Sequence, residues 1–373
     1  MSDKRSIRLK EFAANITKTH TPSEDYIRKS PRLERGKSYF QRTNKDGFIE
    51  THLNYSAKNN VILIGDSFIE NIFVDESKRI SSLVEELSLL SNHKIKVHNA
   101  GVSGSTSLGL LNLVINKIIP LNPDLIIYTQ PSCDFASLIY ERGYYNDSKF
   151  FSNMTPQKDT EKPYYDTIEN NIKQLENNIN ILSYVCKLYR IPLCIATCCS
   201  NSSKRQLKMM NDIIRNGVGY DIIDLDNLVP RIDEYFYDKQ HLTEKGSKFI
   251  SKIFHNYISS KLLMEETAIL ETRNIVFNNS NNWTSEPIDV KNINSSLVIR
   301  ISNLSNQENN IKANILDNDD NILRSVSIDI KEISDLEFTL FLNALGSIKI
   351  NISSIYNNTK DINILSATLY SVL

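Results

Sequence analysis

Residues 61–73, VILIGDSFIENIF, place four apolar residues directly before Gly65, Asp66 and Ser67. A short apolar run bounded by turn-forming residues is typical of a buried strand in a parallel sheet. The period then changes, so the sequence predicts a strand, a tight turn and a helix. Ser67 is expected at the carboxyl end of that strand, where an open α/β sheet presents its site and a helix N-terminus directs backbone N–H groups.

After this stretch, short apolar runs alternate along the chain with segments of helical period. The other predicted strands are residues 94–97, 125–128, 192–196 and 221–223. Residues 110–118 and 168–182 carry apolar side chains at helical spacing, and Thr243 suits the N-cap of a closing helix that reaches about residue 263. This alternation predicts an α/β fold in which helices cover both faces of a mostly parallel sheet.

The amino-acid composition changes after about residue 270, where Asn and Ser become frequent. Apolar residues alternate singly with polar ones in residues 326–330, 338–342 and 348–352, which predicts half-buried strands. Several such strands with turn-rich joints favour an antiparallel, jelly-roll-like β-sandwich. We therefore expect an irregular N-terminal arm over residues 1–57, a catalytic domain over 58–265 and an accessory sandwich over 270–373.

Composition limits the function classes. The formal net charge of −1 over 373 residues argues against wholesale nucleic-acid binding, and no apolar run is long enough to span a membrane. The stretch MSDKRSIRLKEF has no apolar signal-peptide core, so a cytoplasmic location is expected. The five cysteines are an odd number without disulfide-framework spacing, and CIATCC, at residues 194–199, lies in an apolar run without a second ligand pair. We expect reduced thiols and no metal site.

The N-terminal arm is rich in cations, namely Arg28, Lys29, Arg32, Arg35, Lys37 and Arg42. The ordinary interpretation is a solvated arm or a strap over the main domain. The alternative is attraction to phosphate on a donor, a polymer or a membrane surface, including peripheral membrane association.

A serine at a strand end becomes a nucleophile only when a histidine takes its proton and an acid fixes that histidine's tautomer. Of six histidines, His241 stands out, because it falls in YFYDKQHLTEKG, three residues after Asp238 and just before the closing helix. The sequence predicts that Asp238 accepts from Nδ1 of His241 while Nε2 faces Ser67. The alternative is a plain strand-to-helix turn with Ser67 as an N-cap.

These residues resemble the SGNH hydrolases, also called the GDSL-type esterase and lipase superfamily, over roughly residues 60–260. The resemblance implies a flavodoxin-like three-layer fold with a five-stranded parallel sheet. It also assigns the nucleophile to Ser67, in the GDS block, and the acid and base to Asp238 and His241, in the late D-x-x-H block.

The resemblance also bears on the oxyanion hole. The block VHNAGVSGSTS, residues 97–107, places Gly104 as a backbone donor. The family's third block reads G-x-N-D, but here IIYTQPSCDF puts Cys133 where the donor Asn is expected. A thiol donates weakly, so either the hole is completed differently or activity is reduced. The amide of Gln130 is a candidate replacement donor.

The triad chemistry leaves the second nucleophile open, because water gives an esterase and a sugar hydroxyl gives an acyltransferase. Residues 101–128 look like SGNH proteins of bacterial capsule and surface-polysaccharide synthesis, and the sandwich resembles accessory modules of carbohydrate-active enzymes, with Trp283 beside a polar groove. We expect an O-acetyltransferase that uses acetyl-CoA as co-substrate and a carbohydrate polymer or oligosaccharide as acceptor, with no bound cofactor. The alternatives are a carbohydrate or lipid ester hydrolase, and a binding or scaffolding protein with a decayed oxyanion hole.

Overall fold

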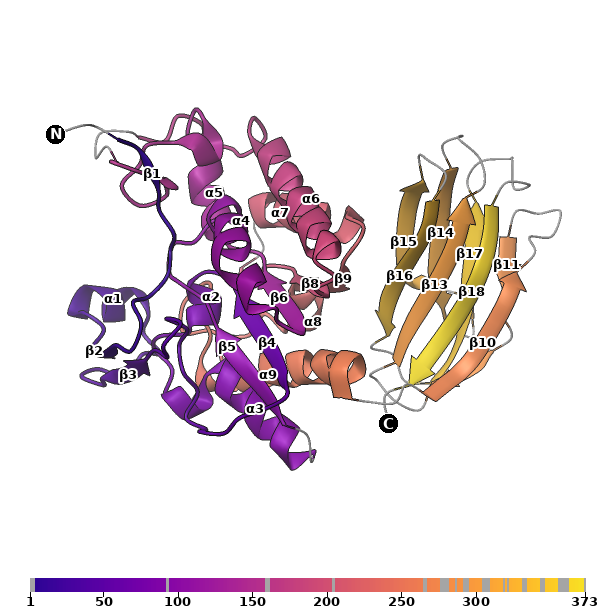
Figure 1. The fold of residues 1–373 in the computed structure, drawn as a ribbon, viewed down its shortest axis with the longest axis horizontal. Coiled ribbons are helices and arrows are strands. Elements are labelled where there is room, and N and C mark those ends of the chain that lie inside the picture. Colours follow the sequence, from indigo (N-terminus) through magenta and orange to yellow (C-terminus); the bar gives the residue numbers. More distant parts are fainter. Residues whose placement is uncertain are drawn as a thin grey trace. The chain divides into compact units, whose positions relative to one another are not determined.

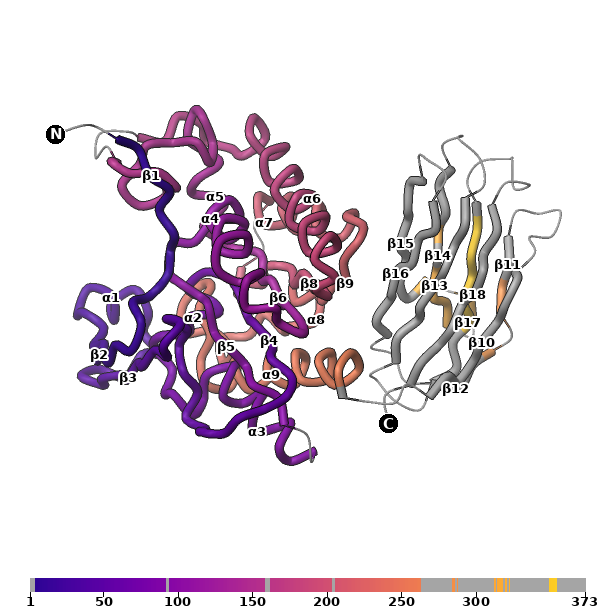
Figure 2. The backbone as a smooth tube through the Cα atoms, in the orientation of Figure 1, coloured from indigo at the N-terminus to yellow at the C-terminus, as the bar shows by residue number. Residues whose placement is uncertain are grey.

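The computed structural model describes most of the chain (Figure 2). The described residues are 4–91, 94–157, 162–202 and 205–263, then 267–275, 282–285, 287–290, 295–303, 309–317, 319–320, 322–330, 334–342, 346–354 and 362–371. The chain divides into two compact units, Met1–Ile214 with Ile223–His255, and Arg215–Ile222 with Asn256–Leu373. Among the described helices, none combines the length and the apolar character needed to cross a bilayer.

A five-stranded sheet lies at the centre of the α/β region. Its strand order is β5-β4-β6-β8-β9, with bounds β4 Asn59–Ile64, β5 Ile95–Asn99, β6 Leu125–Thr129, β8 Leu193–Ala196 and β9 Asp221–Ile223. The β4–β5, β4–β6 and β6–β8 pairs are parallel, with Val61 opposite both Val97 and Leu125. The predicted fold class is therefore confirmed.

Strand β4 forms because its apolar run is covered on both faces. Residues Val61, Ile62, Leu63 and Ile64 are each exposed by 1% or less. Burial of one such side chain stabilises the fold by about 1.5–3 kcal/mol. This buried strand fixes the position of the turn that follows it.

Helices flank the sheet, with α4 and α6 on one side and α3 and α9 on the other (Figure 1). Thr243 accepts from the Gly246 N–H at 3.2 Å and so caps α9, as the sequence predicts. The helices are α2 Ser67–Glu70, α3 Ile80–Leu90, α4 Ser107–Leu113, α5 Cys133–Leu138, α6 Ile172–Leu188, α7 Arg205–Asn216, α8 Leu225–Leu228 and α9 Glu244–Ile258. Shorter turns of helix are Glu76–Lys78, Val114–Ile118, Ile119–Leu121, Gly143–Tyr145 and Ser259–Leu263.

The N-terminal arm is more regular than the sequence indicates. Strand β2 (Thr17–His20) pairs antiparallel with β3 (Tyr39–Arg42), helix α1 (Glu24–Lys29) lies between them, and β1 (Ser6–Ile7) pairs with β7 (Met154–Thr155). These elements have two to six residues. Elements this short show no sustained period, which is why hydrophobic periodicity does not reveal them.

The second unit contains two antiparallel sheets. Their strand orders are β10-β18-β13-β16 and β11-β17-β14-β15, and β12 also pairs with β17. The bounds are β10 Thr267–Ile275, β11 Asn282–Thr284, β12 Ile288–Val290, β13 Ser295–Asn303, β14 Asn309–Leu316, β15 Ile322–Ile330, β16 Ser334–Leu342, β17 Gly346–Ser354 and β18 Ile362–Ser371. The predicted alternating rows fall in β15, β16 and β17. The side chain of Trp283 lies outside the described ones, so the expected polar groove stays a prediction.

Candidate active site

Ser67 is the first residue of α2, directly after β4 and its turn. Asp66 is the N-cap, and its Oδ1 accepts from the Phe68 N–H at 3.0 Å. At the other end of this short helix, the Asn71 side chain donates to Ser247 Oγ in α9 at 2.6 Å. The nucleophile expected from the sequence is thus held at the carboxyl end of a central strand.

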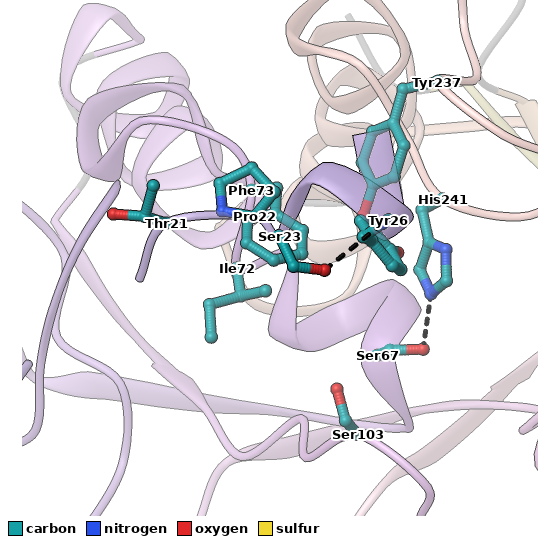
Figure 3. A pocket seen from close by; sticks show the side chains of 10 residues that line it. All are labelled: Thr21, Pro22, Ser23, Tyr26, Ser67, Ile72, Phe73, Ser103, Tyr237 and His241. Carbon is teal, nitrogen blue, oxygen red and sulfur yellow. Dashed lines mark hydrogen bonds between the residues drawn. The ribbon is translucent and has the colours of Figure 1, made fainter. Parts of the chain in front are cut away.

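The loop before α9 brings His241 to Ser67 (Figure 3). His241 Nε2 lies 2.8 Å from Ser67 Oγ, and its Nδ1 lies 2.7 Å from Asp238 Oδ2. The other carboxylate oxygen of Asp238 accepts from the backbone N–H groups of Gln240 and His241, each at 2.7 Å. Two segments 174 residues apart in sequence therefore meet with the spacing and the order of contacts that a serine nucleophile requires.

The surroundings keep Asp238 ionised and His241 oriented. Burial of Asp238 favours the neutral acid, but the hydrogen bonds and the charge of His241 outweigh it and hold the pKa of Asp238 below its usual value. The Tyr237 ring stacks on the imidazole, with centroids 5.4 Å apart and planes 11° apart. The side chains of His241 and Asp238 keep 22% and 19% of their exposure, so solvent reaches the pair.

Asp66 connects the nucleophile turn to the start of α5. Its Oδ2 accepts from the Ser132 N–H at 2.9 Å and from Ser132 Oγ at 2.8 Å, with a longer contact to the Cys133 N–H at 3.4 Å. Asp66 therefore supports this loop by hydrogen bonding.

The block after β5 packs directly on α2. Asn99 donates to the carbonyl of Ile69 at 2.8 Å and accepts from the Gly101 N–H at 2.9 Å. A Cβ on Gly101 would lie 2.3 Å from the backbone nitrogen of Glu70 and 2.7 Å from the carbonyl carbon of Ile69. Only glycine fits this close approach.

The same block ends in a turn at Ser103 and Gly104. Gly104 has φ +73°, a left-handed conformation that favours glycine. Glu70, at the end of α2, accepts from the Ser103 N–H at 2.8 Å and from Ser103 Oγ. Burial raises the pKa of Glu70, and the bonds from Ser103 partly oppose that rise.

Cys133 begins α5 and is a free, half-buried thiol. Burial, followed by the neighbouring Asp66 carboxylate, raises the pKa of this thiol. Cys133 therefore stays protonated at neutral pH, which makes it a poor competitor to Ser67 as nucleophile. As a weak donor it is also a poor replacement for an amide.

Gln130 takes part in a buried network behind the site. Its Nε2 donates to Asp134 Oδ2 at 2.5 Å and to the carbonyl of Pro131 at 3.2 Å. Asp134 also accepts from the N–H and hydroxyl of Ser107 at the start of α4, and burial raises the pKa of Asp134 to about 6. Both amide hydrogens of Gln130 thus have partners, and its proposed oxyanion role has no free donor in this arrangement.

A cavity of about 490 Å³ opens at Ser67 and His241. The N-terminal arm forms much of its wall, and the remaining wall is mostly aromatic and hydroxyl-bearing (Figure 3). The other lining residues are Thr21, Pro22, Ser23, Tyr26, Ile72, Phe73, Ser103 and Tyr237. The rings of Tyr26 and Phe73 are 5.2 Å apart, and those of Phe73 and Tyr237 are 6.4 Å apart, so they form one aromatic cluster.

Several arm cations have acidic partners within the chain. Ion pairs join Arg28 to Asp25, Arg32 to Asp233, Arg35 to Glu24, Lys37 to Asp75 and Arg42 to Glu76. These partners neutralise much of the charge on which attraction to phosphate would depend. Peripheral membrane association through the arm stays a prediction.

The structure shows no disulfide among the five cysteines. Within the described residues, no group of three or more His, Cys, Asp or Glu side chains lies close enough to hold a metal ion.

Sequence reasoning missed the arm residues of the pocket wall, together with Glu70 and Tyr237. Two of these had a local signal: Glu70 follows Ser67 by three residues in GDSFIE, and Tyr237 directly precedes Asp238. The arm residues had none, because their approach to the site depends on tertiary structure alone.

No protein-family model and no curated protein matches the chain. Solved structures similar to it include a two-domain esterase active on acetylated mannans, with 11% identity and a TM-score of 0.37 over 84% of this chain and 91% of that one. Others are a lipase/acylhydrolase from Enterococcus faecalis (17%, 0.39, over 54% and 96%) and the acetyl xylan esterase AlAXEase (16%, 0.38, over 53% and 99%). The chain itself has a parallel sheet flanked by helices and a Ser–His–Asp arrangement at the carboxyl end of a central strand.

Proposed function

We propose that the chain is a serine-dependent O-acetyltransferase, which moves an acetyl group from acetyl-CoA through an acyl-enzyme to a hydroxyl of a bacterial capsule or surface polysaccharide. The observation that carries the serine chemistry is the continuous hydrogen-bonded series from Ser67 through His241 to Asp238, with distances of 2.8 and 2.7 Å. The choice of transfer over hydrolysis, and of a polysaccharide acceptor, is supported by the sequence resemblance described above.

In the first step, Ser67 Oγ attacks the carbonyl carbon of the acyl donor while His241 Nε2 accepts the hydroxyl proton. Asp238 holds the imidazole in the tautomer that leaves Nε2 free to accept, and it stabilises the imidazolium that forms. His241 then returns the proton to the leaving thiol or alcohol as the bond to the carbonyl carbon breaks. The product is an ester between the acetyl group and Ser67.

The negative charge on the carbonyl oxygen needs hydrogen-bond donors. Within the described residues, the backbone N–H groups of Ser67 and Gly104 donate to no other group of the chain. Both belong to segments at the pocket, because Ser67 and Ser103 line it. We assign these two N–H groups to the oxyanion hole, with the thiol of Cys133 as a weak third member.

In the second step, an acceptor hydroxyl attacks the carbonyl carbon of the acyl-enzyme while His241 takes its proton. The bond from that carbon to Ser67 Oγ then breaks, His241 returns the proton to Ser67 Oγ, and the acetylated acceptor leaves. The cavity of about 490 Å³ is large enough for an acyl group with part of its donor or acceptor. Its aromatic cluster and its hydroxyls suit a sugar, whose ring presents apolar C–H faces and hydroxyl edges.

Hydrolysis of a carbohydrate acetyl ester is the second candidate, favoured by a specific observation. No Lys or Arg is among the residues that line the cavity at Ser67, whereas a CoA donor brings phosphates that prefer such partners. The partly exposed His241 and Asp238 side chains also let water reach the acyl-enzyme. Hydrolysis and transfer share every step up to the acyl-enzyme.

The test uses the purified full chain and its Ser67→Ala variant. Release of p-nitrophenol from p-nitrophenyl acetate by the wild type alone establishes the serine chemistry. Consumption of acetyl-CoA that requires a de-O-acetylated glycan supports transfer, whereas acetate release from an O-acetylated glycan without CoA supports hydrolysis. Equal rates in wild type and Ser67→Ala with every donor would refute the proposal.

A further inference from the structure

Lys10, from the N-terminal arm, reaches the turn that carries the proposed oxyanion donor. Its Nζ donates to the carbonyl of Gly104 and lies 3.5 Å from the carbonyl oxygen of Ser103. A Cβ on Gly104 would lie 2.7 Å from this Nζ, so the ammonium packs tightly against the turn. The contact joins segments 94 residues apart.

The Ser103 carbonyl and the Gly104 N–H belong to the same peptide group. A cation on the carbonyl oxygen withdraws electron density from the amide and makes its N–H a stronger donor, since hydrogen bonds in a chain polarise one another. At 3.5 Å from the Ser103 carbonyl oxygen, Lys10 acts on this peptide mainly through its charge, while its shorter bond to the Gly104 carbonyl holds the ammonium in place.

Glu70 holds the opposite side of the same turn. Its side chain accepts from the N–H and the hydroxyl of Ser103, and that N–H belongs to the Val102–Ser103 peptide, one peptide before the one that carries the Gly104 N–H. Glu70 and Lys10 therefore hold the turn from its two sides, Glu70 at Ser103 and Lys10 at the Ser103 and Gly104 carbonyls.

The charged neighbours of Lys10 come from several elements. Asp66 and Glu70 from the nucleophile segment favour its charged form, Arg8 in the arm opposes it, and the Cys133 thiol of α5, protonated at neutral pH, adds no charge there. Lys10 and Lys117 both line a second, small cavity, separate from the one at Ser67, and Lys117 pairs there with Glu11 at 2.6 Å. Burial, with a smaller contribution from Arg8, lowers the pKa of Lys10 to about 8.

Lys10 lies within electrostatic range of Cys133, which stands where the SGNH pattern has its donor Asn. Loss of one oxyanion donor costs about 10²- to 10³-fold in rate, and a thiol at position 133 offers little in place of an amide. A cation near this hole would offset part of that loss.

We propose that Lys10 is a positioning residue of the oxyanion hole, which orients and polarises the Ser103–Gly104 peptide and so offsets the absence of an amide at Cys133. This inference rests on the proposed serine acyl-transfer function. It makes the N-terminal arm part of the catalytic apparatus as well as part of the pocket wall.

The test measures acylation kinetics with p-nitrophenyl acetate for Lys10→Met, Lys10→Arg and Lys117→Met, each checked for thermal stability. Lys10→Met is expected to lower kcat by about tenfold or more, with KM changed less than about threefold because the ground-state carbonyl gains little from the hole. Lys10→Arg should recover most of the rate, and Lys117→Met should match the wild type, because Lys117 lies in the same cavity with a different partner.

Two readouts separate positioning from simple folding support. The rate of the wild type should fall as pH rises through about 8, where Lys10 loses its proton, and this fall should move to higher pH in Lys10→Arg. In a Cys133→Asn background, Lys10→Met should cost severalfold less than in the wild type, because the amide then supplies the missing donor.

Lys10→Met with wild-type kcat, or equal losses in Lys10→Met and Lys117→Met, would overturn the inference while the serine chemistry stands. A Lys10→Met loss that is the same with Cys and with Asn at position 133 would also overturn it. A wild type that never acylates Ser67 would overturn the proposed function and this inference together.

Discussion

Gly101→Ala is expected to damage stability and catalysis through a single displacement. The added Cβ would lie 2.3 Å from the Glu70 backbone nitrogen, whereas ordinary contacts begin near 3.4 Å, so the block after β5 and helix α2 must separate by about 1 Å. Overpacking of this kind costs about 1–3 kcal/mol of unfolding free energy. A misplacement of about 1 Å at a catalytic group costs on the order of 10²-fold in rate.

The assay is kcat/KM for p-nitrophenyl acetate beside the urea midpoint of unfolding. Gly36→Ala is the matched control, because Gly36 has φ +75° and no atom within 4 Å of its added Cβ. It should lose about 1 kcal/mol from backbone strain and keep its activity. Gly101→Ala with activity within twofold of the wild type would refute the packing argument.

Three further predictions address the hydrogen-bond network. Asp238→Asn should lower kcat by about 10³- to 10⁴-fold, since the amide no longer fixes the His241 tautomer; a loss below tenfold in the burst phase would contradict the triad. Gln130→Met should lose about 1–3 kcal/mol of unfolding free energy but less than threefold in acylation rate, because the Gln130 amide bonds to Asp134. A hundredfold loss of acylation rate would indicate instead that Gln130 is an oxyanion donor. The pKa of Asp134 is about 6 in the folded chain against an ordinary value of 3.8, so between these values the folded state binds the proton more tightly than the unfolded state. The difference in unfolding free energy between wild type and Asp134→Asn should therefore fall as pH rises from 4 to 6 and stay constant above pH 7. A difference that is constant over the whole range would contradict the raised pKa of Asp134.

The sequence predicts those features that depend on local pattern. The apolar run before Gly65 marks a buried central strand, and D-x-x-H before the last helix places Asp238 and His241 within reach of a strand-end serine. These features are readable because periodicity and turn chemistry act over a few residues.

Features that depend on tertiary contact are not readable in this way. The arm contributes Tyr26 from α1, a helix too short to show a period, and Lys10 from an irregular stretch. Nothing in the local sequence of Lys10 distinguishes it from other solvated lysines. Likewise, Gln130 is a reasonable donor by position, and only the structure shows its amide bound to a buried Asp134.

The most direct test of the account is mass spectrometry of the intact protein after brief exposure to p-nitrophenyl acetate or acetyl-CoA and an acid quench. We predict an adduct of about 42 Da, one acetyl group, that maps to Ser67 and disappears in Ser67→Ala and His241→Ala. An adduct on another residue at an equal rate in Ser67→Ala, or no adduct and no turnover with any acyl donor, would contradict it.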